Sequence, residues 1–194
     1  MLKNFAKLIS TVFNPIFLLI PVPFVLVLRT TASLNAAIYW ALFSFIFVLI
    51  VGVFILVGIK EGYFSDLDIS RKTQRPVLFS FAVLLCSIYV FSLYFLNAPK
   101  VLFIAIFALF AGLITIEIVN KFTKASIHVA TVSAFATSLF LVYGGIFILS
   151  FLFIPLVAWS RIKTHNHTKD QAIVGALIGV IITVAVYVIF EIYS

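Results

Sequence analysis

The sequence predicts an all-α bundle of about six to seven transmembrane helices, and two observations support this fold class. Hydrophobic residues make up 64% of the 194 residues, and charged residues make up 10%, whereas a soluble domain carries about 25% charged residues. Uncharged runs such as 41–57 and 101–116 approach the ~20 apolar residues that cross a hydrocarbon slab of ~30 Å. Backbone polar groups in lipid must be paired within the segment, so we expect these runs to be helices.

Apolar segments follow one another along the whole chain. They cover roughly 8–28, 36–59, 77–96, 101–119, 127–143, 145–160 and 171–191. No soluble domain, low-complexity stretch or clear repeat interrupts them, so we expect one membrane-embedded domain over 1–194.

The first apolar segment begins like a signal peptide, because two lysines precede it. The apolar run extends to Leu28, however, contains three prolines and shows no clear small-residue cleavage site. We therefore expect this segment to be retained as the first span.

Later segments carry local signals of their own. Pro76 opens the third segment, where proline suits the first turn of a helix. The fifth and sixth segments are short and meet at Gly144-Gly145, which predicts a tight helical hairpin. Gly175 and Gly179 form a G-x-x-x-G pattern in the last segment. This pattern predicts close helix packing within the bundle and leaves open an oligomer formed through the same face.

Most polar residues fall in three short segments, 60–76, 120–128 and 160–171. Two expected spans separate the first segment from the second, and two separate the second from the third. Since an even number of crossings returns the chain to the same side, we expect all three polar segments on one membrane face. All three histidines lie in these segments.

The basic residues suggest which face this is. Eleven of the 13 would lie on the face of the polar segments, and only Arg29 and Lys100 would lie opposite. By the positive-inside rule we expect that face to be cytoplasmic. Because the basic residues flank spans, the expected partners are membrane lipids and not nucleic acid. The single cysteine, Cys86, forms neither an internal disulfide nor a multi-cysteine metal site.

The three polar segments hold the residue types that handle phosphate. Arg and Lys bind phosphate oxygens, and the start of the fifth span would aim backbone N–H groups at the same anion. Of two imidazoles, one can attack phosphorus while the other protonates the departing oxygen. In the first segment, Arg71, Lys72 and Arg75 would share one face if the stretch is helical. The candidates in the other two segments are Lys124, Ser126, His128, Ser160, Arg161, His167 and Gln171.

The spacing of these residues resembles the type 2 phosphatidic acid phosphatase superfamily, which includes vanadium haloperoxidases. That family carries K-x6-R-P, then P-S-G-H, then S-R-x5-H-x3-D. Arg75-Pro76 matches the end of the first motif, and Ser126 and His128 match the second. The third motif is matched, with its spacing intact, by Ser160, Arg161 and His167.

The resemblance implies a phosphatase of lipid metabolism that needs no metal or cofactor. His167 would be the nucleophile that forms a phosphohistidine, and His128 would be the acid for the leaving group. Arg75, Arg161 and the Ser126 region would hold the phosphoryl oxygens. Expected substrates are phosphatidic acid, phosphatidylglycerol phosphate or a polyprenyl (di)phosphate.

Three positions depart from the family pattern. Asp68 stands where the first motif has its lysine, Ala125 and Ile127 replace the Pro and Gly of the second, and Gln171 replaces the final Asp. The Gln171 carbonyl can still accept the imidazole N–H. The Lys-x-Ser-x-His and His-Thr-x-x-Gln forms resemble a divergent prokaryotic membrane branch of the superfamily, which implies a prokaryotic plasma membrane. The cations that can replace the missing lysine are Arg71, Lys72 and Lys124.

Two other functions fit parts of the pattern. A non-catalytic family member would bind lipid phosphate without turnover. Asp66-x-Asp68 before Arg75-Pro76 also resembles the first motif of membrane prenyltransferases, whose carboxylates bind a magnesium diphosphate. That family needs a second acidic cluster, and the four remaining acidic residues form none. We therefore favour the phosphatase interpretation.

Overall fold

The structure is a computed structural model that describes residues 2–67, 69 and 71–192, and every regular element within these residues is a helix. The all-α prediction is therefore confirmed. Asp68 and the side chain of Lys72 lie outside the described residues. In chain order the elements are α1 (Leu2–Val12), α2 (Pro15–Leu19), α3 (Pro21–Thr31), α4 (Leu34–Lys60), η1 (Lys72–Gln74), α5 (Arg75–Phe95), α6 (Lys100–Asn120), α7 (Ile127–Tyr143), η2 (Gly145–Leu152), α8 (Phe153–Lys163) and α9 (Lys169–Ile192).

Within the described residues, five helices are long and apolar enough to cross a membrane. They are α4, α5, α6, α9 and the continuous stretch Gly145–Lys163, which η2 and α8 form together. A sixth results if the bent N-terminal helices make one span. The architecture is compatible with a multi-pass membrane protein. The expected fifth span is α7, whose 17 residues fall short of the ~20 that a straight crossing needs.

The expected first span is broken at its prolines. The Leu2–Leu19 and Pro21–Thr31 segments meet at an angle of 51°. Asn14 starts α2, because its side-chain oxygen accepts the Ile16 N–H at 3.0 Å. Proline lacks an N–H and fixes φ, so a helix restarts at Pro15 and again at Pro21 instead of continuing through them. The expected first span over 8–28 is therefore a bent pair of helices and not one continuous helix.

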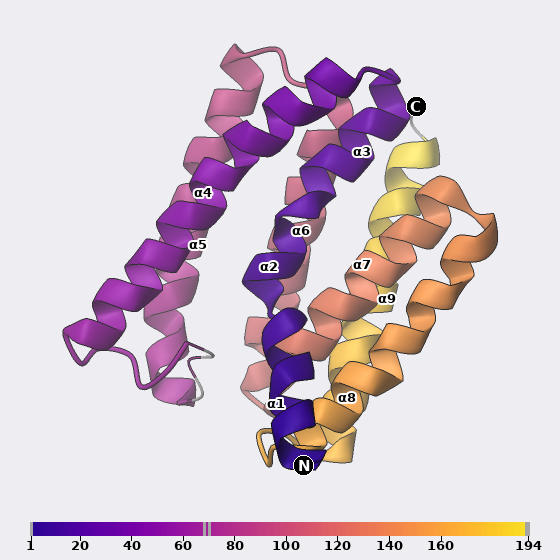
Figure 1. Cartoon of the computed structure of the whole chain (residues 1–194). Coiled ribbons are helices and arrows are strands. Elements are labelled where there is room, and N and C mark those ends of the chain that lie inside the picture. Colours follow the sequence, from indigo (N-terminus) through magenta and orange to yellow (C-terminus); the bar gives the residue numbers. More distant parts are fainter. Residues whose placement is uncertain (1, 68, 70, 193–194) are drawn as a thin grey trace. The chain divides into compact units, whose positions relative to one another are not determined.

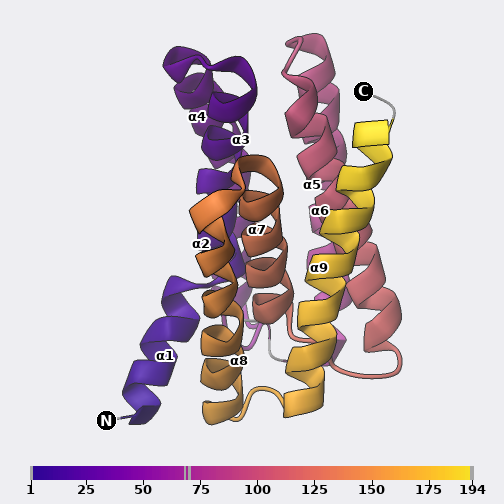
Figure 2. The same ribbon diagram turned by 90° about the vertical axis from the view of Figure 1, so that its right-hand side faces the viewer.

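The described residues form two compact units where the sequence predicts one domain. The first unit combines Met1–Leu18 with Phe107–Ser194, and the second is Leu19–Ile106. In the first unit, α7 packs along α9 and against α8, and α1 packs against α8 (Figure 1). Figure 2 shows α7, α8 and α9 along their lengths. The buried core of this unit consists of Ile9, Leu18, Val129, Val132, Val157 and Ala172.

The second unit contains α3, α4 and α5, with α4 packed against both neighbours. Between α4 and α5, the Ser44 hydroxyl lies 2.7 Å from the Tyr89 hydroxyl in a hydrogen bond. The Phe54 and Phe81 rings stack with their centroids 3.8 Å apart. These contacts tie α4 to α5 at two levels.

The hairpin between α7 and η2 is present as the glycine pair predicted. Gly144 and Gly145 both have positive φ, 64° and 51°, a region that glycine adopts without steric cost. The Ser150 hydroxyl, in η2 after the turn, donates to the Ala136 carbonyl of α7 at 3.2 Å. The turn therefore folds η2 and α8 back along α7.

The glycines of α9 bring its backbone against α7. A Cβ atom built on Gly175 would lie 2.5 Å from the Ser126 carbonyl oxygen, and one on Gly179 would lie 2.2 Å from the Ala130 carbonyl oxygen. Both distances are below any normal van der Waals contact. The predicted close packing within the bundle is confirmed, and the glycine face of α9 is occupied by α7 of the same chain.

This packing predicts opposite outcomes for two glycine-to-alanine changes. Gly179→Ala should lower the melting temperature in detergent, because overpacking a close contact typically costs about 1–3 kcal/mol. Gly112→Ala is the control, since a Cβ there meets nothing within 4 Å and alanine is the better helix former. Equal melting temperatures for the two variants would contradict the close approach of α7 and α9.

Candidate active site

The second and third polar segments meet at one end of the first unit. The Ser126 N–H, just before α7, donates to the Gln171 carbonyl in the first turn of α9 at 3.1 Å. The Lys124 ammonium donates to the Asn166 carbonyl, in the turn after α8, at 3.3 Å. The start of α7, the end of α8 and the start of α9 are thus held together.

The turn after α8 is a helix C-cap closed by backbone hydrogen bonds. The Asn166 N–H donates to the Arg161 carbonyl at 3.1 Å, and the His165 N–H donates to the Ile162 carbonyl at 3.0 Å. His165 has a φ of 59° and occupies the left-handed position that closes such a cap. It is exposed and lies in the loop between α8 and α9. The cap turns the chain so that His167 follows directly.

The start of α9 is a capping box built from Thr168 and Gln171. The Thr168 hydroxyl accepts the Gln171 N–H at 3.3 Å. In return, the Gln171 side-chain oxygen accepts the Thr168 N–H at 3.2 Å. The T-x-x-Q spacing is the sequence signature of this reciprocal arrangement. Because a backbone N–H can only donate, the contact also shows which end of the Gln171 amide is the oxygen.

His167 is buried, and the position of its ring proton follows from its neighbours. Its Nδ1 atom lies 3.2 Å from the Gln171 side-chain oxygen and 3.2 Å from the Lys124 backbone carbonyl. Both neighbours are acceptors, so Nδ1 carries the proton and donates. In the neutral ring the other nitrogen, Nε2, then holds the lone pair. The imidazole N–H thus donates to the Gln171 side-chain carbonyl, a bond that a glutamine at this position can accept.

Ser160 and Arg161 are both buried at the end of α8, and both contact α1. The Ser160 hydroxyl donates to the Ala6 carbonyl at 2.8 Å, and one Arg161 Nη1–H donates to the Ser10 hydroxyl. The motif spacing does not point to Ser10. The signal available for it was the face formed by Ala6, Ile9, Ser10 and Phe13 at helical spacing.

Ser126 and His128 lie at the start of α7. Ser126 is the N-cap residue, but its hydroxyl makes no capping hydrogen bond and, among the described residues, has no hydrogen-bond partner although it is fully buried. His128, in the first turn, is buried too. The Asn120 side-chain oxygen accepts the Ala125 N–H at 3.1 Å and shapes the segment before α7. A hydroxyl, an imidazole and the amides of a helix start therefore occupy one short stretch, which is a suitable composition for an anion site.

The first polar segment belongs to the second unit. Arg75 is buried at the start of α5, and its Nε–H donates to the Ile69 carbonyl at 3.4 Å. Pro76 lies in the first turn of α5, as predicted. Arg71 is exposed and precedes the short η1 turn. The stretch between Arg71 and Arg75 is the 3-10 turn η1, so the condition under which they would share one α-helical face is not met.

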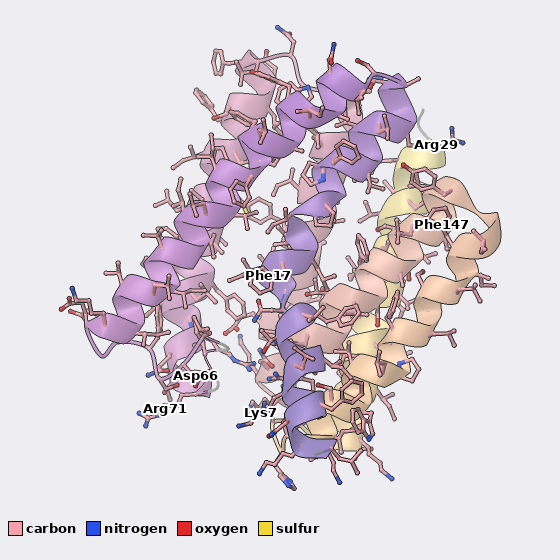
Figure 3. All side chains as sticks on the ribbon, viewed as in Figure 1. Lys7, Phe17, Arg29, Asp66, Arg71 and Phe147 are labelled. Atoms are coloured by element: carbon pink, nitrogen blue, oxygen red, sulfur yellow. The ribbon has the colours of Figure 1, made fainter. Side chains whose placement is uncertain are left out.

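Figure 3 labels Asp66 and Arg71 in the connection between α4 and α5, at the end of α4 opposite to Arg29. The Ser65 N–H donates to the Gln74 side-chain oxygen at 3.1 Å and closes this connection across nine residues. Arg75 belongs to the second unit, whereas the histidines belong to the first. That Arg75 and these histidines converge on one site therefore stays a prediction.

The described residues contain no group of three or more His, Cys, Asp or Glu side chains that could hold a metal ion. Comparisons of the chain with protein-family models, with curated proteins and with solved structures found no match. The family resemblance therefore stands on the motif residues alone and stays a hypothesis.

The double role of the Gln171 oxygen predicts a loss of stability in Gln171→Leu. Both the Thr168 N–H and the His167 ring N–H lose this acceptor, and the free energy of unfolding should fall by about 1–2 kcal/mol. Gln171→Glu is the control, because its carboxylate keeps the acceptor and suits a helix N-terminus. Thermal melting in detergent measures the difference, and a Leu variant as stable as the wild type would contradict the capping box.

Proposed function

We propose that the chain is a multi-pass membrane phosphatase that hydrolyses a lipid phosphate or a polyprenyl (di)phosphate through a phosphohistidine on His167. The observation that carries the proposal is the pair of oxygen acceptors 3.2 Å from the His167 Nδ1 atom. They keep the proton on Nδ1 and the lone pair on Nε2, as a histidine nucleophile requires. The matching spacing of the motif residues supports the same reaction.

The proposed reaction has two steps. In the first, Nε2 of His167 forms a P–N bond while the P–O bond to the leaving group breaks, and His128 gives the departing oxygen a proton. The leaving group is the lipid alcohol of a monophosphate or the lipid monophosphate of a diphosphate. In the second, water attacks phosphorus, the P–N bond breaks and His128 accepts the proton from water. The products are the lipid alcohol and inorganic phosphate, or a lipid monophosphate and phosphate from a diphosphate.

The residues around His167 would support its charge change. Attack makes the imidazole cationic, and its Nδ1–H then donates to two oxygens that stabilise the cation.

Two basic residues lie next to His167 in the structure. The Lys124 backbone carbonyl lies beside the imidazole ring, and the Arg161 backbone carbonyl accepts the hydrogen bonds of the C-cap turn that precedes His167. We assign these two cations, with Ser126 and the Arg71, Lys72 and Arg75 group, to binding of the phosphoryl oxygens. The expected phosphate contact of Ser160 is not proposed, because its hydroxyl already donates to the Ala6 carbonyl.

A bilayer setting suits this substrate class. The acyl or prenyl tails can remain among apolar helices while the phosphate reaches the polar end of the first unit. We further propose seven crossings, with α7 as the short one, in a prokaryotic plasma membrane with the polar segments on the cytoplasmic face. The distribution of basic residues, eleven of 13 on the side of these segments, supports that orientation.

Phosphate release from a panel of lipid phosphates in detergent, with EDTA present, tests the function. The wild type should release phosphate, and His167→Ala should lower kcat by at least about 10³-fold, since removal of a nucleophile leaves only binding contributions. His128→Ala should lower kcat by about 10²–10⁴-fold, the usual contribution of a general acid.

His165→Ala is the matched control, because this exposed histidine lies two residues from His167 and outside the proposed site. Its rate should equal that of the wild type. Release that is equal in the wild type and in His167→Ala would refute the phosphohistidine route. Binding of lipid phosphate without release would identify a non-catalytic protein, and activity that needs magnesium and Asp66 would favour prenyl transfer.

The site also predicts a gain of activity in Gln171→Glu. A carboxylate at the same length should accept the His167 N–H in a stronger, charge-assisted bond and stabilise the cationic ring. Because a charge-assisted hydrogen bond is roughly twice as strong as a neutral one, we expect kcat to rise by roughly tenfold or more, measured in the same release assay. An unchanged or lower kcat would show that Gln171 does not act on the ring's charge.

A further inference from the structure

Helix α1 contacts the two adjacent motif residues at the end of α8. The Ala6 carbonyl accepts the Ser160 hydroxyl at 2.8 Å, and the Ser10 hydroxyl accepts an Nη1–H of Arg161. Ala6 and Ser10 are four residues apart, so they lie on one face of α1. The contacts join segments more than 150 residues apart in the chain.

The register between α1 and α8 is fixed along its length. The Phe5 and Trp159 rings lie 6.2 Å apart at one end of the contact, and the Phe13 and Phe153 rings lie 5.1 Å apart at the other. The two helices are therefore antiparallel. Ile9 adds a buried apolar contact between these ring pairs. Ser10 thus has one defined position opposite Arg161.

The chemistry of Ser10 suits a partner of a phosphate-binding arginine. Ser10 is 8% exposed and Arg161 is 3% exposed, so their hydrogen bond is shielded from water. A hydroxyl orients the guanidinium and leaves its positive charge in place, whereas a carboxylate would neutralise it and compete with an anion. The segment Leu2–Val12 contains no acidic residue.

We propose that Ser10 is a positioning residue for Arg161 and that α1 is therefore part of the phosphate site. This inference rests on the proposed function, in which Arg161 binds the phosphoryl oxygens. Ser10 acts on the substrate only through the guanidinium, and the Ser160 contact with Ala6 holds the same turn of α8.

The kinetic test compares three variants of the full chain in detergent. Ser10→Ala removes the acceptor and should lower kcat/KM by about tenfold or more, as expected for loss of a hydrogen bond to a charged group. Ser10→Thr keeps the hydroxyl and should stay within about threefold of the wild type. Thr11→Val is the control, because the exposed Thr11 hydroxyl donates only to the Lys7 carbonyl of its own helix. Equal kcat/KM for Ser10→Ala and the wild type would refute the inference while leaving the phosphatase in place.

A second test needs no turnover. Phenylglyoxal modifies a buried arginine only when thermal opening exposes it, so the slow modification of Arg161 is followed over time by mass spectrometry with and without inorganic phosphate. In the wild type and in Ser10→Thr, phosphate should slow modification of Arg161. In Ser10→Ala, modification should be faster and protection by phosphate should be lost.

The two assays distinguish failure of the proposed phosphatase function from failure of the proposed role of Ser10. Phosphate protection in the wild type without any phosphate release would reject the enzyme and retain the positioning role of Ser10. Absence of protection in the wild type, or equal protection in Ser10→Ala, would overturn the inference itself.

Discussion

The side-chain oxygen of Gln171 accepts two N–H groups, and the geometry around His167 depends on this shared acceptor. One donor is the backbone of Thr168, so the bond is part of how α9 begins. The other is the imidazole, so the same oxygen orients the ring and selects its tautomer. A helix cap and a candidate nucleophile are thereby coupled. The capping bond from Thr168 holds the Gln171 oxygen in place, and this fixed acceptor gives His167 a defined position before any ligand arrives.

The packing of α9 against α7 also positions the residues of the candidate site. Gly175 lets the backbone of α9 approach the Ser126 carbonyl, and the Ser126 N–H reaches the Gln171 carbonyl in return. The spacing between the two histidine-bearing segments is thus set by backbone contacts, which vary little, and not by long flexible side chains. Small residues at the crossing of α7 and α9 therefore matter to the site as well as to the fold.

Hydropathy predicted the helical class and most of the long apolar helices, because the composition permits little else. Counting crossings placed the segments with Lys124 and His167 together correctly, since antiparallel helices return to the same end. The sequence did not predict the bend at Pro21, because apolar composition continues across it. It also missed the contact of Ser10 with Arg161. That pairing depends on the register of two helices that are distant in the chain, and no local pattern encodes it.

The length of α7 has a consequence for where chemistry would occur. Its 17 residues extend about 25 Å, which is less than the ~30 Å hydrocarbon thickness. As a crossing element, α7 would bring its first turn, with His128, down to the boundary between head groups and acyl chains, or it would thin the bilayer locally. A phosphate attached to a lipid already resides at that depth. If the proposed phosphatase activity holds, substrates would then be selected by the distance of the phosphate from the bilayer midplane, and water-soluble phosphate esters would seldom reach the histidines.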